Sequence, residues 1–412
     1  MKPVAHTPAS DHRHGSLLVA LLALGVWVAC FRFPVVWDAT GIGESHRPFL
    51  DLYGLLASSD AAKAGIDPFR LNDFDPYHRP LVYTEWWLAA GKIGLTRDDT
   101  PWLGWVLVGT TLLTVVAMVR PRTRRECVTT FLWLVSPAML LAVNRANNDL
   151  VVFMVMSAGL LALRASHWPG RALGVVLFAV AAALKYYPLA GLVVLLDART
   201  RRELAGGIAI YAVVLIFAWP PLAAGLASAA RFKPNSEWIY AFGAPVLFRD
   251  FGLKTSVGWL ALTAVLVIWS AWSAWRETPA FRGDEMSQAR TREFMVGAAL
   301  IVGCFFLGGT YVYKLVFAAW LLPWLWREER HAAEGPWRVA TGWLLAAVMS
   351  LEGLMAVVLN RVVTPLSFDA AEILLAATLF TTQLLTWGLV ACLLRFLVQF
   401  ARHRGRELLA RA

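Results

Sequence analysis

Two aspartates near the start of the longest polar segment are candidates for acid–base chemistry. Asp51 lies in the run PFLDLY at 48–53. An apolar setting raises the affinity of a carboxylate for protons, which suits a general base that accepts a proton from a hydroxyl. Asp38, which directly follows Trp37, competes for the same role. The alternative for either residue is a carboxylate that stabilises a helix N-terminus or lies at the surface.

A second set of polar residues interrupts long apolar runs and suits the binding of an anion. Arg145, in the turn 144–149, offers a planar guanidinium that binds a phosphate through two hydrogen bonds. Lys185 and Lys314 stand beside tyrosines within apolar runs, where an ammonium needs an anion or must reach the interface. Arg79 can pair with Asp75 or with a phosphate. The predicted substrate-binding residues are Asn144, Asn148, Asp149, Tyr187, Tyr313 and Asp75, although Asn and Asp are also frequent as caps at tight helical turns.

The elements that position these residues are predicted to be membrane helices. The chain has 412 residues, 58% of them apolar and 16% charged, and a mean hydropathy of +0.57. A membrane span needs about 20 apolar residues, and this composition excludes a soluble globular protein, a coiled coil and a disordered chain. The apolar runs cover 16–36, 101–119, 127–143, 148–164, 171–196, 204–226, 255–275, 294–326, 338–358 and 370–398.

The arginine-rich loops determine the predicted topology. Such loops are cytoplasmic by the positive-inside rule, and all of them fall on that side only if the runs 171–196 and 294–326 are each a pair of short helices that turns at the outer face. We therefore predict an all-α polytopic protein of about 10–12 transmembrane helices with both termini cytoplasmic. The polar tips of the hairpins then meet a large extracytoplasmic first loop, 37–100, which is net acidic.

Several other classes of site are not indicated. The sequence has no Gly-x-Ser-x-Gly, no phosphate-binding Gly-rich loop and no His-Glu-x-x-His. Its four cysteines include no Cys-x-x-Cys, which argues against a disulfide framework or a zinc site. No metal site and no cofactor are indicated, with a divalent metal left open. The net charge of +10 comes in small groups between apolar runs, so we read it as a topology signal and expect no nucleic-acid partner.

The layout and three short motifs resemble the GT-C type of membrane glycosyltransferases, and most nearly family 87. These motifs are the turn AGIDPF at 64–69, the hairpin NND at 147–149 and the break LKYYP at 184–188. Family 87 includes polyprenyl-phosphate-mannose-dependent mannosyltransferases. Its members usually carry Tyr-Pro-Pro before the second helix, whereas this chain reads YTEW at 83–86, which places it in an outlying branch.

The resemblance implies a GT-C-like bundle, with 16–398 as one glycosyltransferase domain between the cytoplasmic tails 1–15 and 399–412. It implies transfer of a mannose-like hexose from a polyprenyl-phosphate sugar to a lipid or glycan acceptor at the outer face of a bacterial inner membrane. Asp51, or else Asp38, would take the acceptor proton, while Arg145 and the two lysines would stabilise the departing phosphate. The alternatives are a transporter or flippase of lipid-linked sugars and an envelope-polysaccharide polymerase.

Overall fold

The fold is helical almost throughout, which confirms the predicted all-α polytopic class. The computed structural model describes residues 11–40, 42, 47–70, 72–232, 240–250, 255–276, 289–307, 310–326, 335–358 and 368–410. In these residues the strands are β1 (Ala241–Phe242) and β2 (Thr310–Tyr311), which pair antiparallel with Ala241 opposite Tyr311.

The helices of the first half contain most of the site. They are α1 (Asp11–Arg32), α2 (Pro34–Thr40), α3 (Leu50–Lys63), η1 (Glu85–Leu88), α4 (Ala89–Lys92), η2 (Arg97–Asp99), α5 (Thr100–Val119), α6 (Arg124–Leu134), α7 (Pro137–Arg145), α8 (Asp149–Ala162), α9 (Trp168–Leu184) and η3 (Tyr187–Asp197). The second half comprises α10 (Arg201–Arg231), α11 (Val246–Asp250), α12 (Thr255–Arg276), α13 (Ala289–Phe306), η4 (Val312–Trp320), α14 (Leu322–Leu325), α15 (Gly335–Val358) and α16 (Phe368–Ala410).

Four helical segments in the described residues are long and apolar enough to cross a membrane, judged by length and composition. A fifth span results if α6 and α7, which are bent by 51° at their junction, are counted together. The four segments are His14–Arg32, Arg97–Val119, Arg201–Arg231 and Ala376–Glu407. The predicted total of about 10–12 spans stays a prediction, because helices such as α8 and α9 are apolar but short.

Both apolar runs that were predicted to break do so. Helix α9 ends at Leu184, where Lys185 takes an extended conformation, and Pro188 occupies the first turn of the returning helix η3. Proline suits that position because a helix leaves its first N–H groups unpaired. The other run divides between α13 and η4, with β2 before η4. The polar residues at these breaks are therefore helix-end residues that lie next to each other in space.

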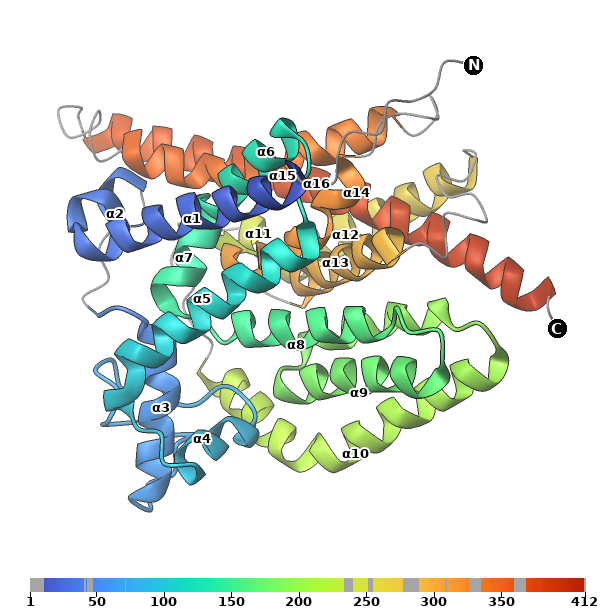
Figure 1. The fold of residues 1–412 in the computed structure, drawn as a ribbon. Coiled ribbons are helices and arrows are strands. Elements are labelled where there is room, and N and C mark those ends of the chain that lie inside the picture. The colour runs from blue at the N-terminus through green and yellow to red at the C-terminus, as the bar shows by residue number, and fades with distance from the viewer. Residues whose placement is uncertain are drawn as a thin grey trace.

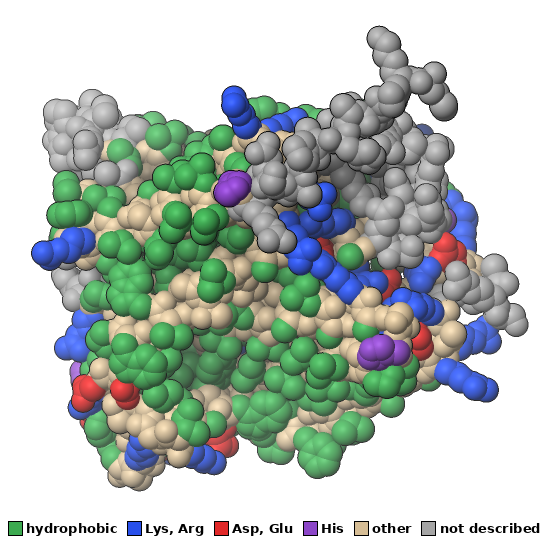
Figure 2. Space-filling view, in the orientation of Figure 1, with side chains coloured by type: hydrophobic (Ala, Val, Ile, Leu, Met, Phe, Trp, Pro, Cys, Tyr) green, Lys and Arg blue, Asp and Glu red, His purple; other side chains and the backbone are tan. Residues whose placement is uncertain are grey.

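Helix α13 lies between two groups of helices (Figure 1). Helices α8, α9 and α10 lie side by side, and α12, α15 and α16 pack together on the other side. Helix α13 contacts η3, η4 and α16. Small residues allow α8 and α9 to approach closely, since a Cβ built on Gly174 would lie 2.8 Å from the carbonyl oxygen of Gly159. Figure 2 shows hydrophobic side chains across the middle of this face, with Lys and Arg toward its ends.

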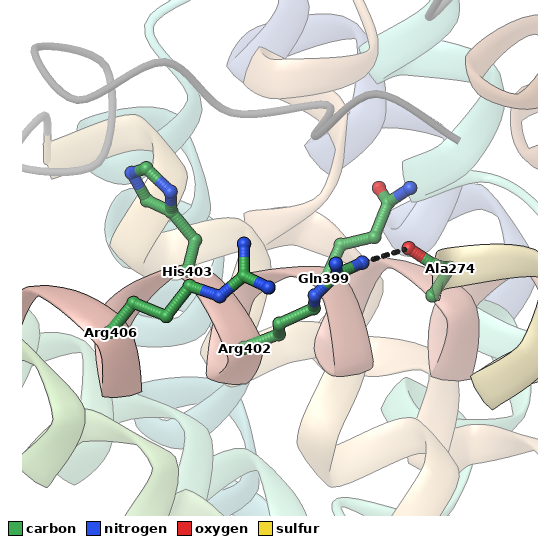
Figure 3. A pocket seen from close by; sticks show the side chains of 5 residues that line it. All are labelled: Ala274, Gln399, Arg402, His403 and Arg406. Carbon is green, nitrogen blue, oxygen red and sulfur yellow. Dashed lines mark hydrogen bonds between the residues drawn. The ribbon is translucent and has the colours of Figure 1, made fainter. Parts of the chain in front are cut away.

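The arginine-rich loops gather at one end of the bundle, as the predicted hairpins require. Arg199 donates to the carbonyl of Ser166 at 3.2 Å, and Arg290 donates to the carbonyl of Met118 at 2.6 Å. At the same end, Arg402 of α16 donates to the last carbonyls of α12, including Ala274 at 3.3 Å (Figure 3). A cation favours a helix C-terminus. Arg404 of α16 also donates to the carbonyl of Leu196 at the end of η3, and Arg164 pairs with Glu293 at the start of α13. Together these contacts bring the ends of α5, η3 and α12 and the starts of α9 and α13 to one end of the bundle.

Candidate active site

The first turn of α3 is fixed against the turn between α7 and α8. Phe49, which precedes α3, has a left-handed backbone with φ of 60°, and its N–H donates to the carbonyl of Asn144 at 2.7 Å. Gly104 of α5 leaves room for the Phe49 ring, because a Cβ there would lie 2.2 Å from a ring carbon. These contacts place Asp51 beside the residues that follow Asn144.

Asp51 accepts hydrogen bonds from three side chains. Arg145 donates from Nε to Oδ2 and from Nη2 to Oδ1, both at 2.9 Å. Asn147 donates to Oδ2 at 2.6 Å, and Nη1 of Arg79 donates to Oδ1 at 3.3 Å. A carboxylate has about four lone-pair positions, so the four donors satisfy Asp51. A substrate hydroxyl can reach it only by replacing one of them, and the Arg79 bond is the longest.

The charges around Asp51 reverse the expected shift of its pKa. Burial alone raises the pKa of Asp51, but the adjacent guanidiniums of Arg145 and Arg79 and the Asn147 amide outweigh burial and hold the pKa below its usual value. The sequence-based prediction of a raised proton affinity is therefore wrong for this state of the protein. Its physical reason is that the apolar sequence around Asp51 gives no sign of the guanidiniums that the fold brings to it.

Arg79 is held by a buried carboxylate of its own loop. Its Nη2 donates to Asp75 at 2.8 Å and to the carbonyl of Leu50 at 2.9 Å. Asp75 is fully buried. The sequence predicts that Arg79 pairs with Asp75 or with a phosphate, and in the structure it pairs with Asp75. The bond to Asp75 holds the Arg79 guanidinium over the first turn of α3.

A second buried carboxylate lies at the start of α8. Asp149 accepts hydrogen bonds from Lys185, from the Tyr187 hydroxyl at 2.7 Å and from Lys314 at 2.6 Å. The Lys314 ammonium lies 3.9 Å from the centre of the Tyr187 ring, and the Lys185 ammonium lies 4.6 Å from that of Tyr83. Both lysines lie at the breaks that the sequence predicts in the apolar runs 171–196 and 294–326. Their two ammoniums share the single carboxylate of Asp149.

Asn147 joins the Asp51 carboxylate to the backbone at the start of α8. Its Oδ1 accepts from the N–H of Asp149 at 2.9 Å while its amide nitrogen donates to Asp51. Tyr83 lies beside this cluster, with its ring centre 4.6 Å from the Lys185 ammonium, and burial followed by the charges of Asp51 and Asp149 raises the pKa of Tyr83. Neither Asn147 nor Tyr83 was in the predicted site. The NND motif contains Asn147, for which a helix cap was the alternative, whereas Tyr83 was noted only as part of YTEW, where the chain departs from the pattern of family 87.

Asn148 has a buried amide that the described protein does not satisfy. The residue is 5% exposed, and neither its Nδ2 nor its Oδ1 has a hydrogen-bond partner in the part of the chain that the structure describes. Buried polar atoms are nearly always paired, so this amide is suited to a polar ligand. Nearby, Tyr313 is buried and stacks on Tyr311 with ring centres 5.4 Å apart.

The site as a whole carries a positive excess. Four cations face three carboxylates: Arg79, Arg145, Lys185 and Lys314 against Asp51, Asp75 and Asp149. The side chain of Asp38 lies outside the described residues, although its backbone belongs to α2. The sequence also predicts a polar tip at the outer face over 360–369, of which 360–367 lie outside the described residues. Within the described ranges, no three His, Cys, Asp or Glu side chains form a group that could hold a metal ion.

The fold and the site define a polytopic helical membrane protein with a buried cationic site at the end opposite its arginine-rich loops. Residues 99–286, which are 188 of the 412 residues, match the model of glycosyltransferase family 87. The match confirms the resemblance to this family of glycosyltransferases over a little less than half of the chain. It includes Asn147 and Lys185 but neither Asp51 nor Lys314. No curated protein and no solved structure matches the chain.

Proposed function

We propose that the protein transfers a mannose-like hexose from a polyprenyl-phosphate sugar to a hydroxyl of a lipid or glycan acceptor. The family 87 match supports sugar transfer. The observation that supports a phosphate donor is the pair of buried lysines on Asp149, because one carboxylate balances only one of the two ammoniums. A donor phosphate supplies the missing negative charge at the place where charge grows as the sugar leaves.

The arginines connect donor binding with activation of the base. Arg145 is the nearest guanidinium to Asp51, and a phosphate competes with Asp51 for the same two N–H groups. As Arg145 turns toward the donor, Asp51 loses both hydrogen bonds and the charge that depresses its pKa. The carboxylate then accepts the proton of the acceptor hydroxyl. Thus Asp51 becomes a better base only when donor is present.

The proposed step exchanges one bond for another. The acceptor oxygen forms a bond to the anomeric carbon, the bond from that carbon to the phosphate oxygen breaks, and polyprenyl phosphate leaves with the electron pair. Asp51 takes the proton of the acceptor. Lys185, Lys314 and Arg145 stabilise the leaving phosphate. The unsatisfied Asn148 amide is placed at the same turn and is assigned to a sugar hydroxyl.

We propose that the reaction uses no metal and no other cofactor. The carboxylates that would ligate a divalent ion already meet arginine or lysine, and these cations repel an approaching metal. The lysines and arginines supply the charge stabilisation that a metal would otherwise give. Transfer by the purified protein is expected to be unchanged by EDTA, and a loss that Mg²⁺ or Mn²⁺ restores would contradict this part of the proposal.

We further propose that the site faces outward from a bacterial inner membrane, with 16–398 as one domain and both tails in the cytoplasm. The support is that the arginine-rich loops gather at the other end of the bundle, where the positive-inside rule places the cytoplasm. Labelling of single cysteines in intact cells tests the orientation. A cysteine at Tyr77 is expected to react with an impermeant maleimide, and one at Arg124 only after lysis.

The test of transfer uses the full-length protein in membranes that contain acceptor. Radiolabelled polyprenyl-phosphate hexoses are supplied, and both labelled acceptor and released polyprenyl phosphate are measured. Asp51→Asn is expected to reduce turnover at least 100-fold, as for loss of a general base, and Lys185→Ala mainly to raise KM for the donor. Asp73→Asn and Lys92→Ala are matched controls, because both residues are exposed in the first loop.

The variants also separate the alternatives. Loss of transfer in Asp38→Asn, with wild-type activity in Asp51→Asn, would move the base to Asp38 and keep the reaction. If wild type leaves every donor intact while labelled lipid-linked sugar changes leaflet, the protein is a transporter and the proposed transfer is wrong. Growth of a labelled polymer from a preformed repeat unit would identify a polymerase instead.

A further inference from the structure

A groove opens between α1 and α5, on the other side of α3 from the catalytic cluster. It has a volume of about 630 Å³. Phe49 and Tyr53 line it, whereas Asp51 points to Arg145. Residues four apart share one face of a helix, and a residue two positions on lies near the opposite face. The groove is therefore separate from the Asp51 cluster and shares only a wall with it.

The inner part of the groove is apolar and aromatic. Its lining includes Val28 and Phe31 of α1 and Trp105 of α5. The Phe31 ring lies 5.0 Å from that of Trp105 and 4.8 Å from that of Phe49, measured between centres. Val28 and Trp105 are both exposed. Since α1 and α5 contain two of the candidate membrane spans, this surface would face hydrocarbon chains of the bilayer.

The rim of the groove is basic. Arg32, at the end of α1, is exposed, and Arg47 and Arg97 also line the groove. The Arg97 guanidinium lies 4.8 Å from the centre of the Phe74 ring and 4.0 Å from Asp60. Asp98 is the acidic residue of the described lining, and with Asp60 beside Arg97, three arginines face two aspartates in the described residues. The rim marks the ends of two spans, which is the depth of lipid phosphates.

We propose that this groove binds an anionic phospholipid of the surrounding bilayer, of the phosphatidylglycerol type. Its phosphate lies against the arginine rim and one acyl chain follows Val28, Phe31 and Trp105 between α1 and α5. An excess of positive charge favours a head group with net negative charge over a zwitterionic one, and the apolar floor favours a lipid over free phosphate. Because Phe49 forms the wall between groove and site, bound lipid supports the first turn of α3.

The test is native mass spectrometry of the full-length protein purified in a neutral detergent. The probes are phosphatidylglycerol and phosphatidylcholine with identical acyl chains. We expect phosphatidylglycerol to bind several-fold more tightly, with a fall of about fivefold on removing one rim arginine in Arg32→Gln. Val28→Trp is expected to weaken binding of both lipids by filling the floor. Arg125→Gln is the matched control, an exposed arginine outside the groove lining.

Location is tested with a photoreactive phosphatidylglycerol, which is expected to label the peptides that contain Val28 or Trp105. Thermal unfolding of each variant verifies folding. Equal binding of the two lipids, or wild-type binding in both Arg32→Gln and Val28→Trp, would overturn the proposal. Displacement of phosphatidylglycerol by equimolar polyprenyl phosphate would also overturn it and assign the groove to the donor. No sugar donor is present, so the result is independent of the proposed transfer.

Discussion

Gly54 provides a test of how much the site depends on Arg79. It lies one turn after Asp51 in α3, and a Cβ at this position would lie 2.6 Å from Nη2 of Arg79 and 2.7 Å from Oδ2 of Asp75. Ordinary contact begins at 3.4 Å, so in Gly54→Ala the guanidinium must retreat by about 0.8 Å, the difference between these distances. Its bond to Asp51, already 3.3 Å long, is then lost.

The effect on activity and the effect on stability are expected to have different sizes. A displacement of about 1 Å near a reacting group can lower a rate by about 100-fold, so we expect turnover to fall by roughly 10- to 100-fold. Alanine favours a helix over glycine by about 0.5–1 kcal/mol. This gain offsets part of the strain, and we expect the free energy of unfolding to change by less than about 2 kcal/mol.

The assay compares transfer and thermal unfolding of Gly54→Ala with those of Gly109→Ala. Gly109 lies inside α5, and a Cβ built on it meets nothing within 4 Å. The control therefore gains the same helix preference without the clash. If Gly54→Ala keeps the turnover of Gly109→Ala and is equally stable, Arg79 and Asp75 do not support the site and the reasoning is refuted.

Three further predictions address the other contacts. Asn147→Ala removes the link between the Asp51 carboxylate and the backbone N–H of Asp149. It is expected to lower turnover about tenfold and the free energy of unfolding by about 1–3 kcal/mol. Asn72→Ala serves as a control at a buried amide outside the cluster, and equal losses of transfer in the two variants would contradict the assignment. In Gly225→Ala the new Cβ would lie 2.3 Å from the Tyr83 carbonyl oxygen. We expect this clash to displace Tyr83 and to raise KM for the donor. An unchanged KM would argue against Tyr83 as a site residue. The folded-state pKa of Asp51 lies below its ordinary value of 3.8, so its contribution to stability is fully present above about pH 4 and is lost as the pH falls through the folded-state pKa. Thermal unfolding between pH 7 and 3 should therefore show a smaller loss of stability in Asp51→Asn than in wild type. An identical loss of stability would disprove the shift.

The ends of the helices, and the grouping of the arginine-rich loops at one end of the bundle, could be predicted from local sequence because their causes are local. Lys185 and Lys314 interrupt apolar runs that cannot continue through a charge without cost. Pro188 fits the first turn of a helix and not its interior. The grouping of the arginine-rich loops follows from one bilayer acting on every loop. These causes need no knowledge of which helix lies beside which.

Contacts between distant segments could not be predicted in this way. Asp51 and Arg145 are separated by 94 positions, and Lys314 and Asp149 by 165. The sequence predicted that the acidic residues and the lysines and arginines lie at the same face of the protein, but not which of them form ion pairs. It also left open whether Asn147 caps the next helix or belongs to the site, and in the structure the side chain does both, since its Oδ1 accepts from the N–H of Asp149 and its Nδ2 donates to Asp51.

What the sequence by itself determined was a helical membrane protein whose polar residues gather at one end, since hydropathy and charge act on each segment separately. Only the tertiary structure decided that Arg145 and Arg79 hold Asp51 as a carboxylate and that two lysines share Asp149. The physical reason is that a pKa depends on charges within a few ångströms, whatever their distance along the chain. For the same reason an apolar neighbourhood in the sequence predicted the opposite shift for Asp51 from the one that its folded surroundings impose.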